Sequence, residues 1–235
     1  MFKGFNRKDI VKRAMETARA EYNGGTISAA QMQEKAKYIS GVRGKMERLK
    51  REAEARRQYL ERTERHLKLV RDGIGANVLF VSIDTGFDPD TKELHEVGVT
   101  TMKNGEPLTT NYIVSGFENI RTTPCHLGHT MVMDLDLLKL HIQSIYDEAD
   151  YVVFNAAHID KEVLGLDTRK TRYFDTAWLC HRHFYGDTPA LSELCSFYGI
   201  DASNLHNSGV DSYYTLRVLF SQAFSTRKPY FYAKK

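Results

Sequence analysis

The chain has 235 residues, a length sufficient for one sizeable α/β domain and an appendage. Its composition, 42% hydrophobic and 27% charged residues, is typical of a globular protein. No run of about 18 or more apolar residues occurs, which argues against a transmembrane helix. Its three cysteines, Cys125, Cys180 and Cys195, are an odd number without the paired spacing of a metal site, and they favour a reducing compartment over a disulfide framework.

The net charge of +3 conceals an uneven distribution along the chain. Residues 1–73 carry 19 Lys and Arg against 10 Asp and Glu, a net charge of +9, whereas residues 74–235 carry a net charge of −6. This contrast divides the chain into a basic N-terminal arm and a second domain. The charge of the arm is consistent with a solvated helix surface, and also with a surface that binds a polyanion or a protein partner.

The arm is predicted to be helical. Residues 7–22 have apolar side chains at helical spacing, and Asn23-Gly24-Gly25 is a stop signal. Ser28 begins a Ser-x-x-Gln capping box, and residues 28–71 are expected to form one helix about 65 Å long. The apolar residues of this helix alternate at spacings of three and four, which favours a coiled coil or docking on a partner, although Arg56 in this seam argues against a tight dimer.

Asp72-Gly73-Ile74-Gly75 is the predicted boundary, because glycines end the helix and the apolar period changes there. After it we expect strands at residues 78–84, 94–102 and 110–114, a helix at about 135–147, a strand at 151–154, and helices that start near Asp160, Leu191 and Ser208. Three early strands followed by alternating helices and strands predict an α/β sheet of mixed direction.

Three short motifs place polar residues at the ends of these elements. Asp84 ends an apolar run, where strands of open α/β sheets meet ligands, although a turn aspartate has the same appearance. Asn155 follows a buried strand and Asp160 falls in the first turn of the next helix, which an Asn cap and the helix dipole would also explain.

The third motif opens the last helix. His206 precedes this helix and Asp211 lies five residues later. Ser208 and Asp211 have the spacing of a capping box, so the motif taken alone could be a helix start with a loop histidine before it.

Order and spacing of the three motifs resemble the DEDDh group of 3′-5′ exonucleases, which have a ribonuclease H-like fold and include the proofreading subunits of bacterial DNA polymerase III and ribonuclease T. The similar segments are "SIDTGFDPDTKELHEVGV", "FNAAHIDKEVL" and "HNSGVDSYYTLRVL". The resemblance spans about residues 77–222, so residues 74–235 are interpreted as an exonuclease-type domain and the arm lies outside the resemblance.

The resemblance implies a mixed sheet with flanking helices and a site that holds two Mg²⁺ or Mn²⁺ ions, which prefer oxygen ligands. It implies that the metal ligands are Asp84, Asp160 and Asp211. The general base would be His206, because an imidazole exchanges protons near neutral pH. Thr85 and Asn155 would contact the substrate, which is DNA or RNA.

The sequence departs from the family at one position. The first motif of the family is Asp-x-Glu, whereas Gly86 stands here, so the glutamate is either replaced or lost in a short deletion. Asp88 and Glu96 are the nearby acids that could compensate, although Asp88 resembles part of a turn and Glu96 also occurs in active family members.

Two functions therefore remain open. One is a metal-dependent 3′-5′ exonuclease, weakened by the missing glutamate and assisted by the arm. The other is a catalytically inactive binding or scaffold module of a nucleoprotein assembly, with a protein partner or self-association through residues 28–71. We expect a cytoplasmic protein, with a mitochondrial location as the alternative because the N-terminus is basic; Asp9 and Glu16 argue against a presequence.

Overall fold

The computed structural model describes residues 7–74, 76–119, 124–167, 173–180 and 188–225. It divides into two compact units, Met1–Arg62 and Thr63–Lys235. The sequence placed the boundary at Asp72–Gly75, where the long helix ends, whereas the two units meet inside that helix. Gly75 lies outside the described residues.

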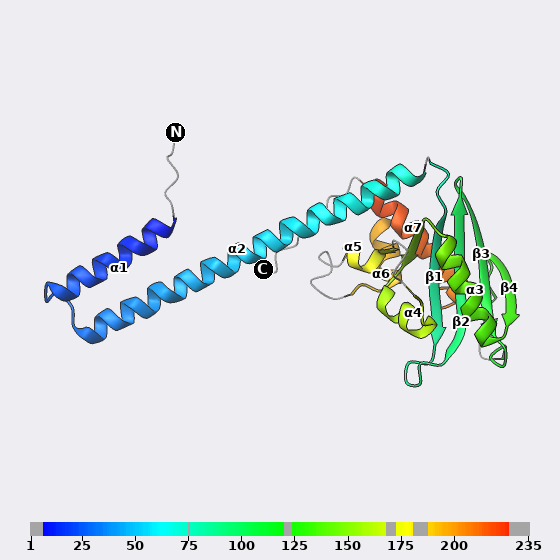
Figure 1. The fold of residues 1–235 in the computed structure, drawn as a ribbon, viewed down its shortest axis with the longest axis horizontal. Helices are drawn as coiled ribbons and strands as arrows, with labels where there is room; N and C mark the ends of the chain where they lie inside the picture. Colours follow the sequence, from blue (N-terminus) through cyan, green and yellow to red (C-terminus); the bar gives the residue numbers. More distant parts are fainter. Residues whose placement is uncertain (1–6, 75, 120–123, 168–172, 181–187, 226–235) are drawn as a thin grey trace. The chain divides into compact units, whose positions relative to one another are not determined.

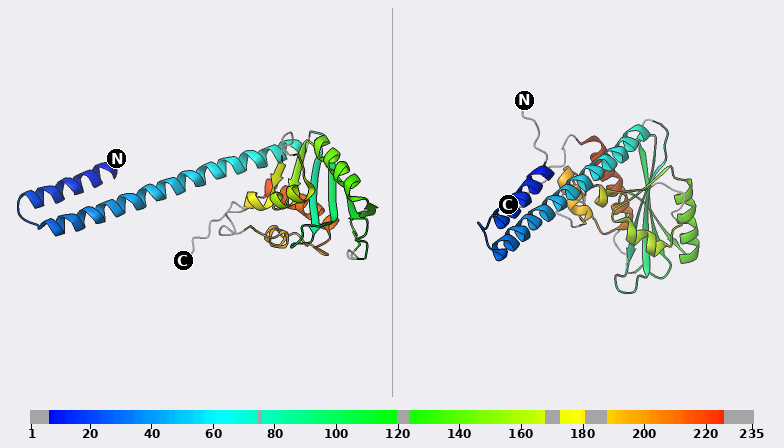
Figure 2. Two further views of the ribbon diagram at one scale, coloured as in Figure 1. Left: turned by 60° about the horizontal axis from the view of Figure 1, so that its bottom comes forward. Right: turned by 60° about the vertical axis from the view of Figure 1, so that its left-hand side comes forward.

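The first unit is a helical hairpin. Helix α1 (Arg7–Asn23) runs beside the first part of α2 (Ala29–Ile74), as Figures 1 and 2 show. Ala18 of α1 is buried, and Met15 of α1 and Met46 of α2 line one pocket between the helices. The capping box at the start of α2 is confirmed, because the Ser28 N–H donates to Gln31 Oε1 at 2.8 Å and the Gln31 N–H donates to Ser28 Oγ at 3.3 Å.

The last turns of α2 belong to the second unit. Val70 is fully buried there, in one cluster with Phe80 and Leu219. Gly73 allows this contact, since a Cβ at that position would lie 3.0 Å from the Phe80 ring. The helix thus ends at Ile74, as the glycines predicted, after packing its final turns into the α/β core.

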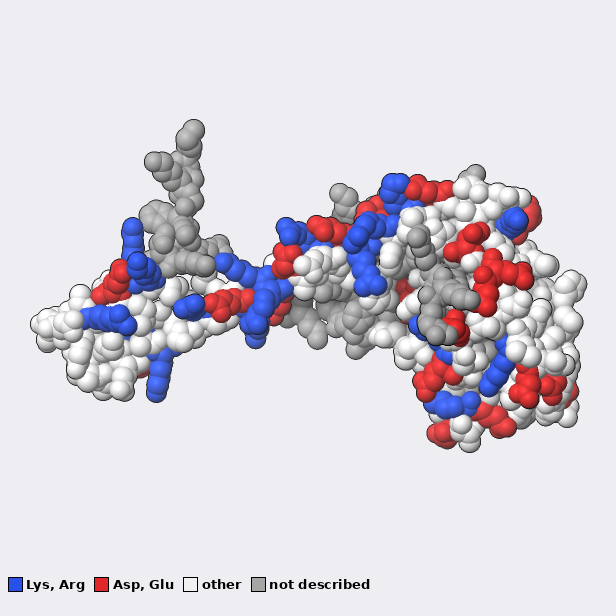
Figure 3. Space-filling model, viewed as in Figure 1, with Lys and Arg blue, Asp and Glu red and all other residues white. Residues whose placement is uncertain are grey.

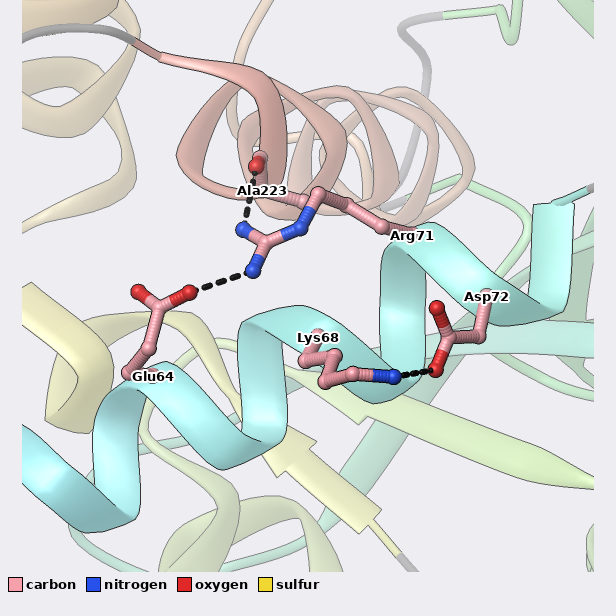
Figure 4. Close-up of polar contacts among 5 residues, drawn as sticks. All are labelled: Glu64, Lys68, Arg71, Asp72 and Ala223. Carbon is pink, nitrogen blue, oxygen red and sulfur yellow. Dashed lines mark hydrogen bonds and ion pairs between the residues drawn. The ribbon is translucent and has the colours of Figure 1, made fainter.

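Polar contacts fix these same turns from the outside. Arg71 donates through Nη1 to the carbonyl oxygen of Ala223 at 2.8 Å and pairs with Glu64, and Lys68 pairs with Asp72 (Figure 4). The bond to Ala223 joins the end of α2 to the last turn of the final helix, and it is partly buried.

The second unit is built on a six-stranded mixed sheet in the order β4-β3-β2-β1-β5-β6. Its strands are β1 (Phe80–Phe87), β2 (Leu94–Lys103), β3 (Glu106–Val114), β4 (Gly128–Met133), β5 (Tyr151–Phe154) and β6 (Tyr173–Asp175). Strands β1, β2 and β3 pair antiparallel, whereas β4, β5 and β6 each pair parallel to a neighbour. The predicted α/β architecture with a mixed sheet is confirmed.

Helices cover both faces of this sheet (Figures 1 and 2). They are α3 (Leu135–Glu148), α4 (Ala157–Leu164), α5 (Thr176–Cys180), α6 (Leu191–Tyr198) and α7 (Ser208–Phe224). Helices α3 and α4 pack with Val81 and Ile83 of β1 on one face, and α7 packs with Phe80 on the other. Because side chains of a strand alternate, Asp84 and the position of Gly86 lie on the α7 face.

Of the helices that the structure describes, none combines the length and the apolar character that a membrane crossing requires.

Candidate functional site

The three acids of the sequence motifs come from three different elements. Asp84 lies in β1, Asp160 lies in the first turn of α4, and Asp211 lies in the first turn of α7. Strand β1 is the parallel neighbour of β5, which leads into α4, and α7 packs on β1 and β2. The topology therefore brings the elements that carry the three acids to the same part of the sheet.

Asp84 is the acid whose pKa is affected by both other carboxylates. Burial, and then repulsion from the carboxylates of Asp160 and Asp211, raise the pKa of Asp84 well above its ordinary value. A hydrogen bond from Ser208 opposes this rise, and Glu96 adds further repulsion. Asp84 thus lies in a group of negative charges that disfavour one another.

Asp160 is held by the residue that follows Asp84. The backbone N–H and the hydroxyl of Thr85 both donate to Asp160 Oδ1, at 3.0 and 2.7 Å. Asp160 is only 5% exposed, and this burial raises its pKa to about 7, with Asp175 adding repulsion and the Thr85 bonds lowering it. Thr85, which was expected to contact the substrate, thus contacts Asp160.

His206 and Asp211 are linked through the backbone. The His206 N–H donates to both carboxylate oxygens of Asp211, at 3.2 and 3.1 Å. Burial raises the pKa of Asp211 to about 6, while the His206 N–H and the His206 charge lower it and Glu96 raises it. His206 is exposed and has a φ of 75°, a left-handed conformation that is uncommon outside glycine and marks strain near a helix start.

A buried glutamate holds the start of α7 against the sheet. Glu96, 1% exposed, accepts through Oε1 from the Ser208 N–H at 3.2 Å and through Oε2 from Asn111 Nδ2 at 3.1 Å. Asn111 Oδ1 in turn accepts from the Gly209 N–H at 2.9 Å. Strands β2 and β3 thereby satisfy N–H groups that the first turn of a helix leaves free.

Two glycines make this close approach feasible. A Cβ at Gly98 of β2 would lie 1.8 Å from the carbonyl oxygen of Ser208, and one at Gly209 would lie 2.8 Å from Cys125 Sγ. Gly98 is the partner of Asp84 in the β1–β2 ladder. The contact of α7 with Gly98 therefore positions the first turn of α7, including Asp211, beside Asp84.

Gly86 lies within β1, directly opposite Glu96 in the ladder. A side chain at position 86 would therefore share a face with Asp84 and neighbour Glu96. Asp88 forms part of the β1–β2 turn: its Oδ1 accepts from the N–H groups of Asp90 and Thr91 at 2.8 Å each, and these bonds lower its pKa. Asp88 therefore belongs to a turn, as one interpretation of the sequence predicted, and its carboxylate accepts hydrogen bonds within that turn.

Asn155 lies at the end of β5, where its Oδ1 accepts from the Thr176 hydroxyl at 2.9 Å. Sequence reasoning missed the neighbouring acid Asp175, whose carboxylate accepts from the N–H groups of Ala156 and Ala157 at 3.2 and 3.0 Å. Asp175 fixes the turn that leads into α4 and so helps to place Asp160. The sequence feature that could have identified Asp175 is its position at the end of a short strand.

The donor chemistry of the site fits a hard divalent cation. Carboxylates are the oxygen ligands that Mg²⁺ and Mn²⁺ prefer, and a cation would offset both the burial and the repulsion that raise the pKa of Asp84. Within the described part of the chain, however, no three His, Cys, Asp or Glu side chains are close enough to hold one ion. Asp84, Asp160 and Asp211 would have to rotate toward a common ion.

A comparison of the chain with protein-family models and with curated proteins gives no match.

Proposed function

We propose that the chain is a ribonuclease H-like, metal-dependent 3′-5′ exonuclease that acts on DNA or RNA. The mixed sheet with helices on both faces is compatible with this fold. The observation that carries the proposal is the convergence of Asp84, Asp160 and Asp211 from three separate elements. Burial raises the pKa of all three, and repulsion from Asp160 and Asp211 raises that of Asp84 further. Acidic groups that are kept close at a cost in stability are typical of catalytic sites.

In this proposal Asp84, Asp160 and Asp211 would hold the divalent ions. When bound, such ions supply an activated water and stabilise charge on the phosphate. Thr85 keeps one oxygen of Asp160 oriented, and Glu96 keeps the first turn of α7 in place. The exposed imidazole of His206 accepts the proton of the attacking water, and its backbone N–H holds Asp211 at the same time.

The second candidate function is an inactive exonuclease-like module that binds nucleic acid or protein. Two observations favour it. Gly86 leaves the site without the fourth carboxylate of the family motif. Among the described residues, no three His, Cys, Asp or Glu side chains are close enough to hold an ion. Both functions use the same fold, so cleavage is what separates them.

The test is cleavage of 5′-labelled single-stranded DNA and RNA in Mg²⁺ and in Mn²⁺. We expect progressive shortening from the 3′ end by the wild type, with Mn²⁺ more effective because it binds incomplete sites more tightly. Asp211→Asn should reduce the rate at least about 100-fold and His206→Ala by about 100-fold. Asp90→Asn removes an exposed acid of the β1–β2 turn and serves as the matched control, with no change expected.

Two results would decide against the exonuclease. If the wild type shortens neither substrate with either ion, the inactive module becomes the better interpretation. If shortening persists unchanged in Asp211→Asn, the activity belongs to a contaminant.

A further inference from the structure

The helical hairpin has two different sides. Helix α1 packs on the side of α2 that carries Ile39 and Met46, whose neighbours in α1 include Ala18 and Met15. The opposite side of α2 is an exposed row at alternating spacings of four and three, which follows one face of a helix. This row, called the basic stripe, consists of Lys37, Gly41, Gly44, Arg48, Arg51, Ala55, Gln58 and Arg62.

The composition of the basic stripe differs from the rest of the helix. It holds four cations and no acid, although α2 up to Arg62 contains five glutamates, all of which lie off the stripe. Between the cations stand two glycines, an alanine and a glutamine. From Lys37 to Arg62 the stripe runs for about 38 Å at 1.5 Å per residue. The result is a row of positive charge that winds slowly around α2, with little side-chain bulk between the cations. Both basic and acidic side chains project from the hairpin (Figure 3), but the acids lie off this row.

The two glycines have no structural role within the described chain. A Cβ at Gly41 or at Gly44 would meet nothing within 4 Å, and neither residue has a positive φ. Glycine inside a helix is less stable than alanine, so internal packing does not explain its presence. Glycine does allow another molecule to approach the helix backbone closely, and both glycines lie between the cations Lys37 and Arg48.

Three of the four cations, Lys37, Arg48 and Arg51, are available to a ligand. In the part of the chain that the structure describes, Lys37 and Arg51 make no ion pair. Arg48 pairs with Glu52 at 3.3 Å, but their side chains are 68% and 60% exposed. Such exposed pairs contribute little and exchange readily for a phosphate.

The chemistry of the basic stripe selects among partners. A second copy of the stripe would bring like charges together. A helix that inserts one face into a bilayer would need apolar side chains on that face, and the stripe has only Ala55. A line of phosphates satisfies both the charge and the narrow profile. We propose that the basic stripe binds the phosphate backbone of a nucleic acid, a role that goes beyond cleavage and does not require it.

The test is the affinity of the full chain for a fluorescent DNA duplex of about 30 base pairs and for one of its single strands, measured by anisotropy against salt. All proteins carry Asp211→Asn, so that cleavage does not interfere. The stripe variant is Lys37→Gln, Arg48→Gln and Arg51→Gln. The matched control, Arg13→Gln, Arg19→Gln and Lys50→Gln, removes the same charge from exposed positions of the same unit.

We expect the stripe variant to bind at least about tenfold more weakly at 0.1 M salt, and the slope of log affinity against log salt to fall by about 2 to 3, because each phosphate contact contributes about 0.9 on duplex DNA. The control should change affinity less than about threefold. Equal losses in both variants would overturn the stripe in favour of diffuse attraction, and absence of binding by the parent protein would overturn the proposal altogether.

A second variant tests the close approach without changing charge. Gly41→Gln with Gly44→Gln should not disturb the hairpin, since both positions face open space. We expect weaker binding by at least about threefold with helix content, measured by circular dichroism, equal to or above that of the parent. Unchanged or tighter binding would show that the glycines do not admit the backbone and would overturn that part of the proposal.

Discussion

Asp160→Asn should stabilise the α/β unit in the absence of divalent ions. Asn keeps Oδ1, the atom that accepts from the N–H and the hydroxyl of Thr85, so those hydrogen bonds are retained. What the substitution removes is a negative charge on a side chain that is 5% exposed and that Asp175 repels. The change therefore isolates the cost of the charge from the packing of the residue.

The magnitude follows from the pKa of Asp160, which burial raises from 3.8 to about 7. The folded protein holds this proton more tightly than the unfolded chain, so the associated stability is fully present below about pH 4 and is lost as the pH rises through 7. At 1.36 kcal/mol per pH unit the loss is about 4 kcal/mol at most.

The measurement is urea unfolding in EDTA, followed by fluorescence of Trp178, the single tryptophan, which lies in α5 of the α/β unit. We expect the variant to exceed the wild type by a few kcal/mol at about pH 8 and to match it below about pH 4. A variant that is less stable than the wild type, or a difference that does not change with pH, would refute the reasoning.

Two further substitutions test how the start of α7 is positioned. Gly98→Ala would place a Cβ 1.8 Å from the Ser208 carbonyl oxygen and should destabilise the α/β unit by about 3 kcal/mol or more in urea unfolding. The control is Gly41→Ala in the helical hairpin, where a Cβ faces open space; it should raise helix stability by about 0.5 to 1 kcal/mol. Glu96→Gln would turn an NH₂ group toward Asn111 Nδ2 and should cost about 1 to 3 kcal/mol; a neutral effect would contradict the hydrogen-bond network.

The elements with the strongest apolar patterns were predictable from the sequence. The strand Tyr151–Phe154 has the bounds that were predicted, and the helix Leu191–Tyr198 begins where it was predicted, because a short buried strand and an amphipathic helix leave clear signals in the sequence. Strand β4 was missed since nearly all of Gly128–Met133 is exposed at the sheet edge, which leaves no alternation to detect. Strand β6 and helix α5 were missed because they are too short to establish a period.

The site was predictable only in part. The spacing of the motifs placed Asp84, Asp160 and Asp211 at element ends, and the fold brings these ends together. The contacts that fix them are not local: Glu96 and Ser208 are 112 positions apart in the chain, and their bond depends on how closely α7 approaches β2. No pattern within a single segment contains that information. The roles of the three acids, and of His206, stay predictions until cleavage is measured.

Titration of the protein with Mn²⁺, with free ion followed by electron paramagnetic resonance, tests most directly whether the three carboxylates form one cation site. We expect the wild type to bind Mn²⁺ at millimolar or lower concentration, and Asp84→Asn to weaken this binding about 10- to 100-fold. Asp90→Asn, in the exposed turn, should leave it unchanged. Equal Mn²⁺ binding by the wild type and by Asp84→Asn, or no binding by either, would contradict a metal site at Asp84, Asp160 and Asp211.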